Sequence, residues 1–406
     1  MSETSASKQK VLLDDYQTGD FFLSSPNQAL IGKGIYSKVE EEEGQANQLE
    51  NLPERVKVAL NRAKLAGQVN PVAVGAVPFD HFEPSQLVIP ADVSISGRIH
   101  MDPDDQAALS SMSSYEMESI PQPEEFINGV NQGLKTIKEG PISKIVLSRS
   151  LDITAREKVD VQQLLKNLAL HNTQGYTFAV DLPEETKGRS EVPEKRTLVG
   201  ASPELLVSKS GDTLLANPLA GSRPRSDDAA EDQRRALELL DSAKDLHEHA
   251  VVVDMVKEGL APFCDGIEVP EQPSLVKTEA MWHLSTEIKG KLRDVATSSL
   301  ELAIALHPTP AVCGHPTALA REEIYKIEPF DRGFFTGMVG WCDANGDGEW
   351  IVTIRCAEVK ARSLRLYAGA GVVAGSKAED ELAETSAKLQ TMLQAMGVKK
   401  ESLIDQ

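Results

Sequence analysis

The stretch SKIVLSRSLDITAREKVDVQQLLKNLALHNTQGYTFAV, residues 143–180, contains a β-rich run, a segment with helical periodicity and a second β-rich run. These three segments, at residues 145–151, 159–172 and 176–180, predict a strand, a helix and a strand. Further strands are expected at residues 197–200, 205–208 and 213–215, and further helices at residues 123–140, 229–259, 298–306 and 378–396. Because strands and helices alternate irregularly and no repeat of fixed period occurs, the pattern favours an α+β fold over a regularly wound α/β fold.

The composition is that of a globular protein. Of 406 residues, 41% are hydrophobic and 26% are charged, a balance that provides a packed core in one large domain or two ordinary ones. No apolar run is long enough for a membrane helix, and the first residues, MSETSASKQK, lack the apolar stretch of a secretory signal, so the expected location is cytoplasmic. The four cysteines form no CxxC pair, which argues against a zinc site or a disulfide scaffold.

The net charge restricts the partners. A formal charge of −20 repels nucleic acid and anionic membrane surfaces, and no block of Lys and Arg interrupts it. We therefore expect neither nucleic acid nor membrane as a partner. If the ligand is a small anion, the chain must gather its cations in one place or bind a metal ion.

Three short motifs resemble known sites but lack an essential part. GAGVVAG, residues 369–375, has the glycine spacing GxGxxxG without an evident strand–loop–helix unit and ribose-binding acid. DANGDGE, residues 343–349, begins like a calcium loop, but the twelfth position is not glutamate, so a turn between two strands explains it better. His247, Glu248 and His249 are adjacent, which is not the HExxH spacing of a zinc-binding helix.

Two predicted helices carry acidic residues three positions apart. Asp245 and Glu248 share one helix face, and so do Glu381 and Glu384, with Lys388 one turn beyond Glu384. Taken singly, such a pair is more often a solvated helix face than a functional site. The spacing alone therefore does not show that the two pairs belong to one site.

A family resemblance provides the link between the two pairs. From about residue 141 onward the chain resembles the chorismate-utilising enzymes, which include anthranilate, aminodeoxychorismate, salicylate and isochorismate synthases. The nearest subgroup is the bacterial isochorismate synthases that supply 2,3-dihydroxybenzoate for catechol siderophores. The motifs that carry the resemblance are, in family order, SKIVLSRSLDI, LVGASPELLVSKSG, NPLAGSRPR, KDLHEHAVVVDMV, WHLSTEIKGKL, LHPTPAVCGHP, TIRCAEV and YAGAGVVAGSKAEDELAET.

The resemblance implies an acid and a base. Lys144 matches the general base that takes a proton from the water attacking C2 of the chorismate ring. Glu204 matches the general acid that protonates the C4 hydroxyl as it leaves. A lysine base needs a lowered pKa and a glutamic acid donor a raised one, which is the pattern of an acid/base pair in one pocket.

The resemblance also implies a magnesium site and a substrate site. Glu248 and Glu384 match the Mg²⁺ ligands, with Asp245 and Glu381 as outer partners that hold metal-bound water. Because chorismate is a dianion, metal and basic side chains must outweigh the surrounding acids. The substrate-binding set comprises Gly221, Ser222, His283, Ala311, Val312, Arg355, Gly369 and Lys388.

The fold implied by the resemblance has two packed β-sheets surrounded by helices, with the active site in the cleft. We expect a flexible N-terminus at residues 1–10 and one chorismate-binding catalytic domain over residues 11–400. The match is strong over residues 141–398 and looser over residues 11–120. A monomer is expected.

Several functions remain open within this resemblance. Ala220 stands where aminodeoxychorismate relatives place a lysine, and Lys144 points to water as the nucleophile, so no glutamine amidotransferase subunit is expected. Isochorismate synthesis is the favoured function, and its product would serve siderophore or menaquinone synthesis. The alternatives are a salicylate synthase, which also eliminates pyruvate, and a non-catalytic chorismate-binding protein.

Overall fold

The computed structural model describes residues 12–41, 47–99, 115–185 and 194–398. The expected flexible N-terminus, residues 1–10, lies outside the described residues. Among the residues described, no helix has both the length and the apolar character needed to cross a membrane.

In the described part of the chain, most of the strands belong to one antiparallel sheet of 17 strands. In order of pairing these are β12 (Cys264–Glu268), β15 (Ile288–Leu292), β10 (Thr213–Asn217), β9 (Leu205–Ser210), β18 (Gly348–Val352), β17 (Met338–Asp343), β3 (Val72–Val77), β4 (Gln86–Gly97), β2 (Gln28–Lys38), β1 (Phe21–Ser24), β7 (Tyr176–Glu185), β8 (Glu194–Ser202), β19 (Cys356–Lys360), β20 (Ser363–Val373) and β6 (Lys144–Ala155). Two short strands, β5 (Tyr115–Ile120) and β16 (Gly314–His315), complete the sheet along the outer edge of β6.

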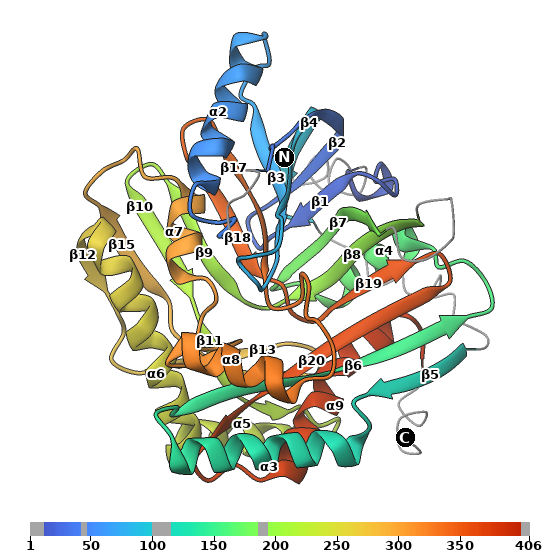
Figure 1. Ribbon diagram of the computed structural model, residues 1–406, viewed down its shortest axis with the longest axis vertical. Helices are drawn as coiled ribbons and strands as arrows, with labels where there is room; N and C mark the ends of the chain where they lie inside the picture. The colour runs from blue at the N-terminus through green and yellow to red at the C-terminus, as the bar shows by residue number, and fades with distance from the viewer. Residues whose placement is uncertain (1–11, 42–46, 100–114, 186–193, 399–406) are drawn as a thin grey trace.

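The sheet curls so that its two halves face each other (Figure 1). One buried cluster contains Val339 of β17 together with Phe178 of β7, which lie far apart in the pairing order. The two predicted β layers are therefore present. They are halves of one sheet, because the pairing continues between them through β4, β2 and β1.

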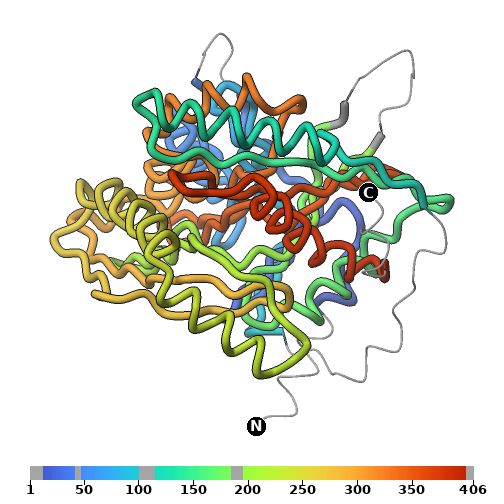
Figure 2. The backbone as a smooth tube through the Cα atoms, turned by 90° about the horizontal axis from the view of Figure 1, so that it is seen from below, coloured from blue at the N-terminus to red at the C-terminus, as the bar shows by residue number. Residues whose placement is uncertain are grey.

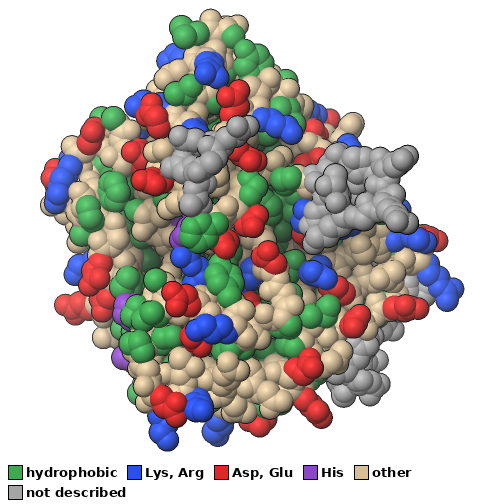
Figure 3. Space-filling model, viewed as in Figure 1, with side chains coloured by type: hydrophobic (Ala, Val, Ile, Leu, Met, Phe, Trp, Pro, Cys, Tyr) green, Lys and Arg blue, Asp and Glu red, His purple; other side chains and the backbone are tan. Residues whose placement is uncertain are grey.

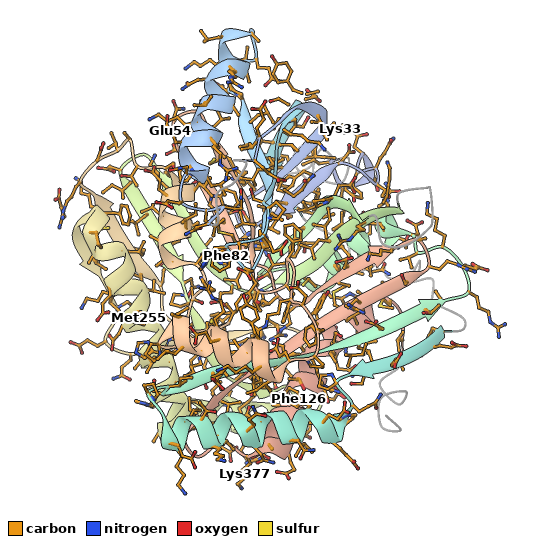
Figure 4. All side chains as sticks on the ribbon, viewed as in Figure 1. Lys33, Glu54, Phe82, Phe126, Met255 and Lys377 are labelled. Atoms are coloured by element: carbon orange, nitrogen blue, oxygen red, sulfur yellow. The ribbon has the colours of Figure 1, made fainter. Side chains whose placement is uncertain are left out.

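Helices surround the strands. They are α2 (Leu52–Leu65), α3 (Pro123–Glu139), α4 (Val161–His171), α5 (Ala229–Asp241), α6 (Ala243–Leu260), η2 (Ala261–Phe263), α7 (Ser299–Leu306), α8 (Thr317–Ile327) and α9 (Ala378–Ala395). Helices α2, α6 and α7 share one apolar cluster, and α4 and α9 share another. Helices α3 and α9 run side by side (Figures 1 and 2), and Phe126 of α3, labelled in Figure 4, is buried in a cluster with Ile145 and Leu147 of β6.

A second, three-stranded sheet stands apart from the large one. It contains β11 (Leu219–Pro224), β14 (Met281–Ser285) and β13 (Ser274–Lys277) in that order. The pairing of β11 with β14 shifts between Ala220 and Ser222, so Gly221 has no register partner and forms a bulge. Helix α6 packs against β11, which brings the acidic face of α6 close to this bulge.

The helix expected over residues 229–259 is two helices in the structure. Helix α5 ends at Asp241, and α6 begins at Ala243 after Ser242, whose side chain accepts a hydrogen bond from the Asp245 backbone N–H at 3.3 Å. Ser242 with Asp245 three residues later is an N-cap pattern that the sequence already contains. The break places Asp245 and Glu248 in the first two turns of α6.

Candidate active site

All of the predicted catalytic and substrate-binding residues except Lys144 line one cavity. About 650 Å³ of space lies between its lining atoms, part of it open to solvent. Strand β20 of the large sheet forms one wall. Helices α6 and α9 supply acidic side chains, and β11 and β14 of the small sheet form another wall. The residues of the predicted site that line the cavity are Glu204, Gly221, Ser222, Glu248, His283, Ala311, Val312, Arg355, Gly369, Glu384 and Lys388.

Lys144 lies at the first position of β6, next to the cavity and almost fully buried. Its Nζ is 2.8 Å from Oε1 of Glu248 on α6, and the lysine side chain is only 2% exposed. The contact is an ion pair without hydrogen-bond alignment. A Cβ at Gly371 of β20 would lie 2.4 Å from Glu248 Oε1 and 3.2 Å from Lys144 Cε, so glycine lets this strand approach the ion pair without displacing it.

Glu204 stands between β8 and β9 and is 3% exposed. Burial raises the pKa of Glu204 to about 7, although Lys144, Lys388 and Arg355 act in the opposite direction. Leu219 donates a long backbone hydrogen bond of 3.5 Å to its Oε1. A carboxyl group with such a pKa is still partly protonated near neutral pH, as a general acid must be.

Arg355 and His283 form a buried pair at the cavity wall. Nη2 of Arg355 lies 3.2 Å from Nε2 of His283. Burial, together with Arg355 and Lys388, holds the pKa of His283 well below its ordinary value, so the neutral ring accepts this hydrogen bond through Nε2. Nη1 of Arg355 is buried and has no hydrogen-bond partner among the described residues, which leaves a charged donor available to an anionic ligand.

Glu384 and Lys388 are one turn apart on α9. Their side chains are 2.7 Å apart, and Lys388 also donates to the Gly369 carbonyl at 2.8 Å. Burial tends to raise the pKa of Glu384, but Lys388 and the Ser222 hydroxyl outweigh it and hold the pKa below the ordinary value. Glu384 is therefore a carboxylate that faces the same cavity as Glu248.

Asp245 and Glu381, the predicted outer partners of the metal, do not line the cavity. Asp245 pairs with Arg223 at 2.6 Å, and Glu381 pairs with Lys244 at 3.1 Å. Burial and the nearby Glu384 raise the pKa of Glu381 against the effect of Lys244. Within the described residues, no group of three or more His, Cys, Asp or Glu is arranged to hold a metal ion.

The chemistry of the two lining glutamates nevertheless fits magnesium. Mg²⁺ commonly binds through one or two carboxylates and completes its shell with water and substrate oxygens. Glu248 and Glu384 provide such a pair in one cavity.

Two residues that shape the site were not predicted. His249 contacts the Ala220 carbonyl and the Thr286 hydroxyl, and burial lowers its pKa to about 4. Arg332 forms a buried pair with Glu328 and donates to the carbonyls of Val146 and Val312, both of which line the cavity. No sequence motif points to either residue, because both contact backbone groups of other segments of the chain.

Comparison with known proteins identifies the family. A sequence model described as "Chorismate binding enzyme" matches residues 93–397. The isochorismate synthase DhbC of Bacillus subtilis is 60% identical over 391 residues, which cover 96% of this chain and 97% of that protein. The chain belongs to the isochorismate synthases of the chorismate-binding enzyme family. The vibriobactin-specific isochorismate synthase of Vibrio cholerae is 42% identical over 378 residues, covering 93% of this chain and 91% of that protein.

The family has the same fold in a solved structure. The crystal structure described as that of a 2,3-dihydroxybenzoate-specific isochorismate synthase, DhbC, from Bacillus anthracis superposes with a TM-score of 0.90 at 55% identity. The superposition covers 96% of this chain and 100% of the Bacillus anthracis chain. The resemblance read from the sequence motifs and the expected fold are confirmed, whereas the roles of individual residues remain predictions.

Proposed function

We propose that this isochorismate synthase converts chorismate to isochorismate with Lys144 as base and Glu204 as acid, for the synthesis of 2,3-dihydroxybenzoate siderophores. Lys144 removes a proton from the water that attacks C2. The ring double bonds shift, the C4–O bond breaks, and Glu204 protonates the departing hydroxyl. One water enters and one water leaves, so no redox partner is needed. The observation that carries this proposal is the burial of Lys144 and Glu204 beside one cavity, with the pKa of Glu204 raised to about 7.

The remaining side chains hold the dianion in place. Arg355 offers its buried Nη1 to a substrate carboxylate, and Lys388 adds a second positive charge from α9. His283 keeps Arg355 oriented through the 3.2 Å contact with Nη2. Ala311 and Val312 form an apolar part of the wall against the ring.

Magnesium is the cofactor that the family generally requires. We assign Glu248 and Glu384 as its ligands, with Asp245 and Glu381 as outer partners. When bound, magnesium would neutralise a substrate carboxylate and stabilise charge that develops as the ring bonds reorganise. The enzyme acts in the cytoplasm as a monomer. It needs no amidotransferase subunit, because its nucleophile is water and not ammonia.

The test is to incubate the purified protein with chorismate and Mg²⁺, with and without a chelator, and to identify the products by chromatography and mass spectrometry. Isochorismate without pyruvate, lost on chelation, is the expected result. Salicylate with pyruvate would assign a salicylate synthase instead, and binding of chorismate without turnover would indicate a non-catalytic protein.

A further inference from the structure

His249 is a buried histidine that follows Glu248 on α6 and takes no part in the proposed chemistry. It is 3% exposed; Nδ1 lies 3.2 Å from the Ala220 carbonyl oxygen, and Nε2 lies 2.7 Å from the Thr286 hydroxyl. A carbonyl oxygen can only accept, so Nδ1 carries the proton and donates to Ala220. Nε2 is then the acceptor, and Thr286 donates to it. The ring is held at both nitrogens.

The partner of His249 is the peptide bond that leads into the bulge of β11. In a planar trans peptide the C=O and N–H groups point in opposite directions. With the Ala220 carbonyl turned toward His249, the Gly221 N–H points away from that ring. Gly221 has no register partner in β14, and both Ala220 and Gly221 line the cavity.

The backbone torsion at Gly221 would allow this peptide to turn if nothing held it. Gly221 has φ 78°, in the left-handed region that glycine enters without strain, so a rotation of the Ala220–Gly221 peptide meets little local resistance. A rotated peptide would aim the Ala220 carbonyl oxygen away from His249. The cavity already contains the carboxyl groups of Glu204, Glu248 and Glu384. Another oxygen acceptor facing it would oppose a dianionic ligand.

We propose that His249 is a positioning residue that locks the Ala220–Gly221 peptide so that the Gly221 N–H, and not the Ala220 carbonyl, is offered to the substrate. The inference rests on the proposed function, since chorismate is the ligand that needs the donor. His249 touches no substrate itself. It acts on substrate binding only through the orientation of the Ala220–Gly221 peptide.

Two substitutions of similar size separate this role from simple core packing. In His249→Asn the side-chain amide nitrogen branches from Cγ, as Nδ1 does, and can still donate to the Ala220 carbonyl. In His249→Gln the amide extends toward the Nε2 position and Thr286. We expect His249→Asn to keep kcat/KM for chorismate within about threefold of the unmodified enzyme, and His249→Gln to lower it by about tenfold, the effect of losing one oriented hydrogen bond.

The control measurements are the thermal midpoint and the Mg²⁺ dependence of both variants. The proposal requires similar midpoints and an unchanged Mg²⁺ dependence, because Glu248 is left in place. Equal kinetic losses in the two variants that follow their thermal midpoints would reduce His249 to a packing residue. A His249→Gln enzyme with normal kinetics would likewise overturn the proposal.

If neither His249 variant folds, a second pair of variants, at Thr286, tests the same proposal. Thr286→Val removes the donor to Nε2 and lets the ring turn, whereas Thr286→Ser keeps it. A lower kcat/KM for Thr286→Val than for Thr286→Ser is expected, and equal values would refute the lock. If the unmodified chain does not convert chorismate, the proposed function fails, and calorimetric titration with chorismate then tests whether the same variants differ in affinity.

Discussion

Lys144 combines a charged ammonium group with almost no exposure to solvent. A lysine in such a position is costly unless a partner compensates it, and the partner here is Glu248, at 2.8 Å. The pairing joins the proposed base to a proposed metal ligand. A change at either residue therefore leaves the other without its buried partner, so the thermal midpoint of each variant must be measured beside its kinetics.

Replacing Lys144 by Ala should slow turnover severely while chorismate still binds. We expect kcat to fall by about 10²- to 10⁴-fold, the usual contribution of a general base. Steady-state kinetics and calorimetric binding of chorismate provide the measurements. Lys138→Ala is the matched control, because Lys138 is an exposed lysine in the last turn of α3. A Lys144→Ala enzyme with normal rates would remove this residue from the base role.

Replacing Glu248 by Gln should weaken magnesium binding. The amide keeps the size of the side chain but removes the negative charge that Mg²⁺ needs. We expect a loss of Mg²⁺ affinity by at least about tenfold, measured by calorimetry and by the Mg²⁺ dependence of kcat. The exposed Glu379 on α9 supplies the control, Glu379→Gln, which should behave as the unmodified enzyme. Unchanged affinity in Glu248→Gln would exclude Glu248 as a ligand.

The pH dependence should report Glu204. Burial raises its pKa to about 7, so the protonated fraction is high below that pH and falls as the pH rises through it. If Glu204 is the acid, kcat/KM declines on the alkaline side with an apparent pKa near 7. A pH profile of kcat/KM provides the check. In Glu204→Gln we expect low activity without this limb, and a variant that keeps both rate and limb would contradict the assignment.

At the scale of helices, the two acidic pairs show what spacing can predict and what it cannot. Spacing predicted that each pair shares one helix face. In the structure the second acid of each pair, Glu248 and Glu384, lines the cavity, whereas Asp245 is held by Arg223. That division depends on cations supplied by other segments. No pattern within α6 or α9 contains this information.

The division of residues 229–259 into α5 and α6 was predictable and was missed. The apolar periodicity continues across the break, which favours one long helix. The Ser242 N-cap signal opposes it, and the cap prevails in the structure. His249, by contrast, offered no signal, because its partners Ala220 and Thr286 come from other segments of the chain.

The pair Arg332–Glu328 joins elements that surround the cavity. Arg332 bonds Glu328, the carbonyls of Val146 and Val312, and the Thr336 hydroxyl. Arg332→Met should destabilise the protein by about 3–5 kcal/mol, because a buried carboxylate loses its partner. Urea unfolding measures the loss. The double variant Glu328→Leu with Arg332→Met should recover part of it, and a single variant as stable as the unmodified protein would contradict the pair's importance.

At the scale of the molecule, the family resemblance predicted the β layers and the position of the site between packed elements. It did not predict that both layers belong to one sheet, because strands β1 to β4 precede the strongly matching region. The expected single domain over residues 11–400 remains a prediction. The continuity of the sheet is consistent with it.

The net charge of −20 should make stability depend on salt. On the face shown in Figure 3, acidic and basic side chains are intermixed rather than gathered in a block of one sign. Net self-repulsion therefore acts over the whole molecule, and salt screens it as the Debye length falls from about 30 Å at 0.01 M to about 8 Å at 0.15 M. The thermal midpoint at pH 8 should rise over this range of NaCl. A midpoint that falls would show that local ion pairs dominate.

The pairing of β6 with β20 also governs when an active molecule can first exist. Lys144 begins one of these strands and Gly369 lies on the other, whose residues are 363–373. At roughly 5–20 residues per second, a ribosome needs about 10–40 s to reach β20 after it has made β6. During this interval β6 has an unpaired, largely apolar edge, which is the kind of surface that chaperones bind. A nascent chain that stalls before residue 363 already carries Lys144 but cannot complete the cavity, so turnover begins only when synthesis is almost finished.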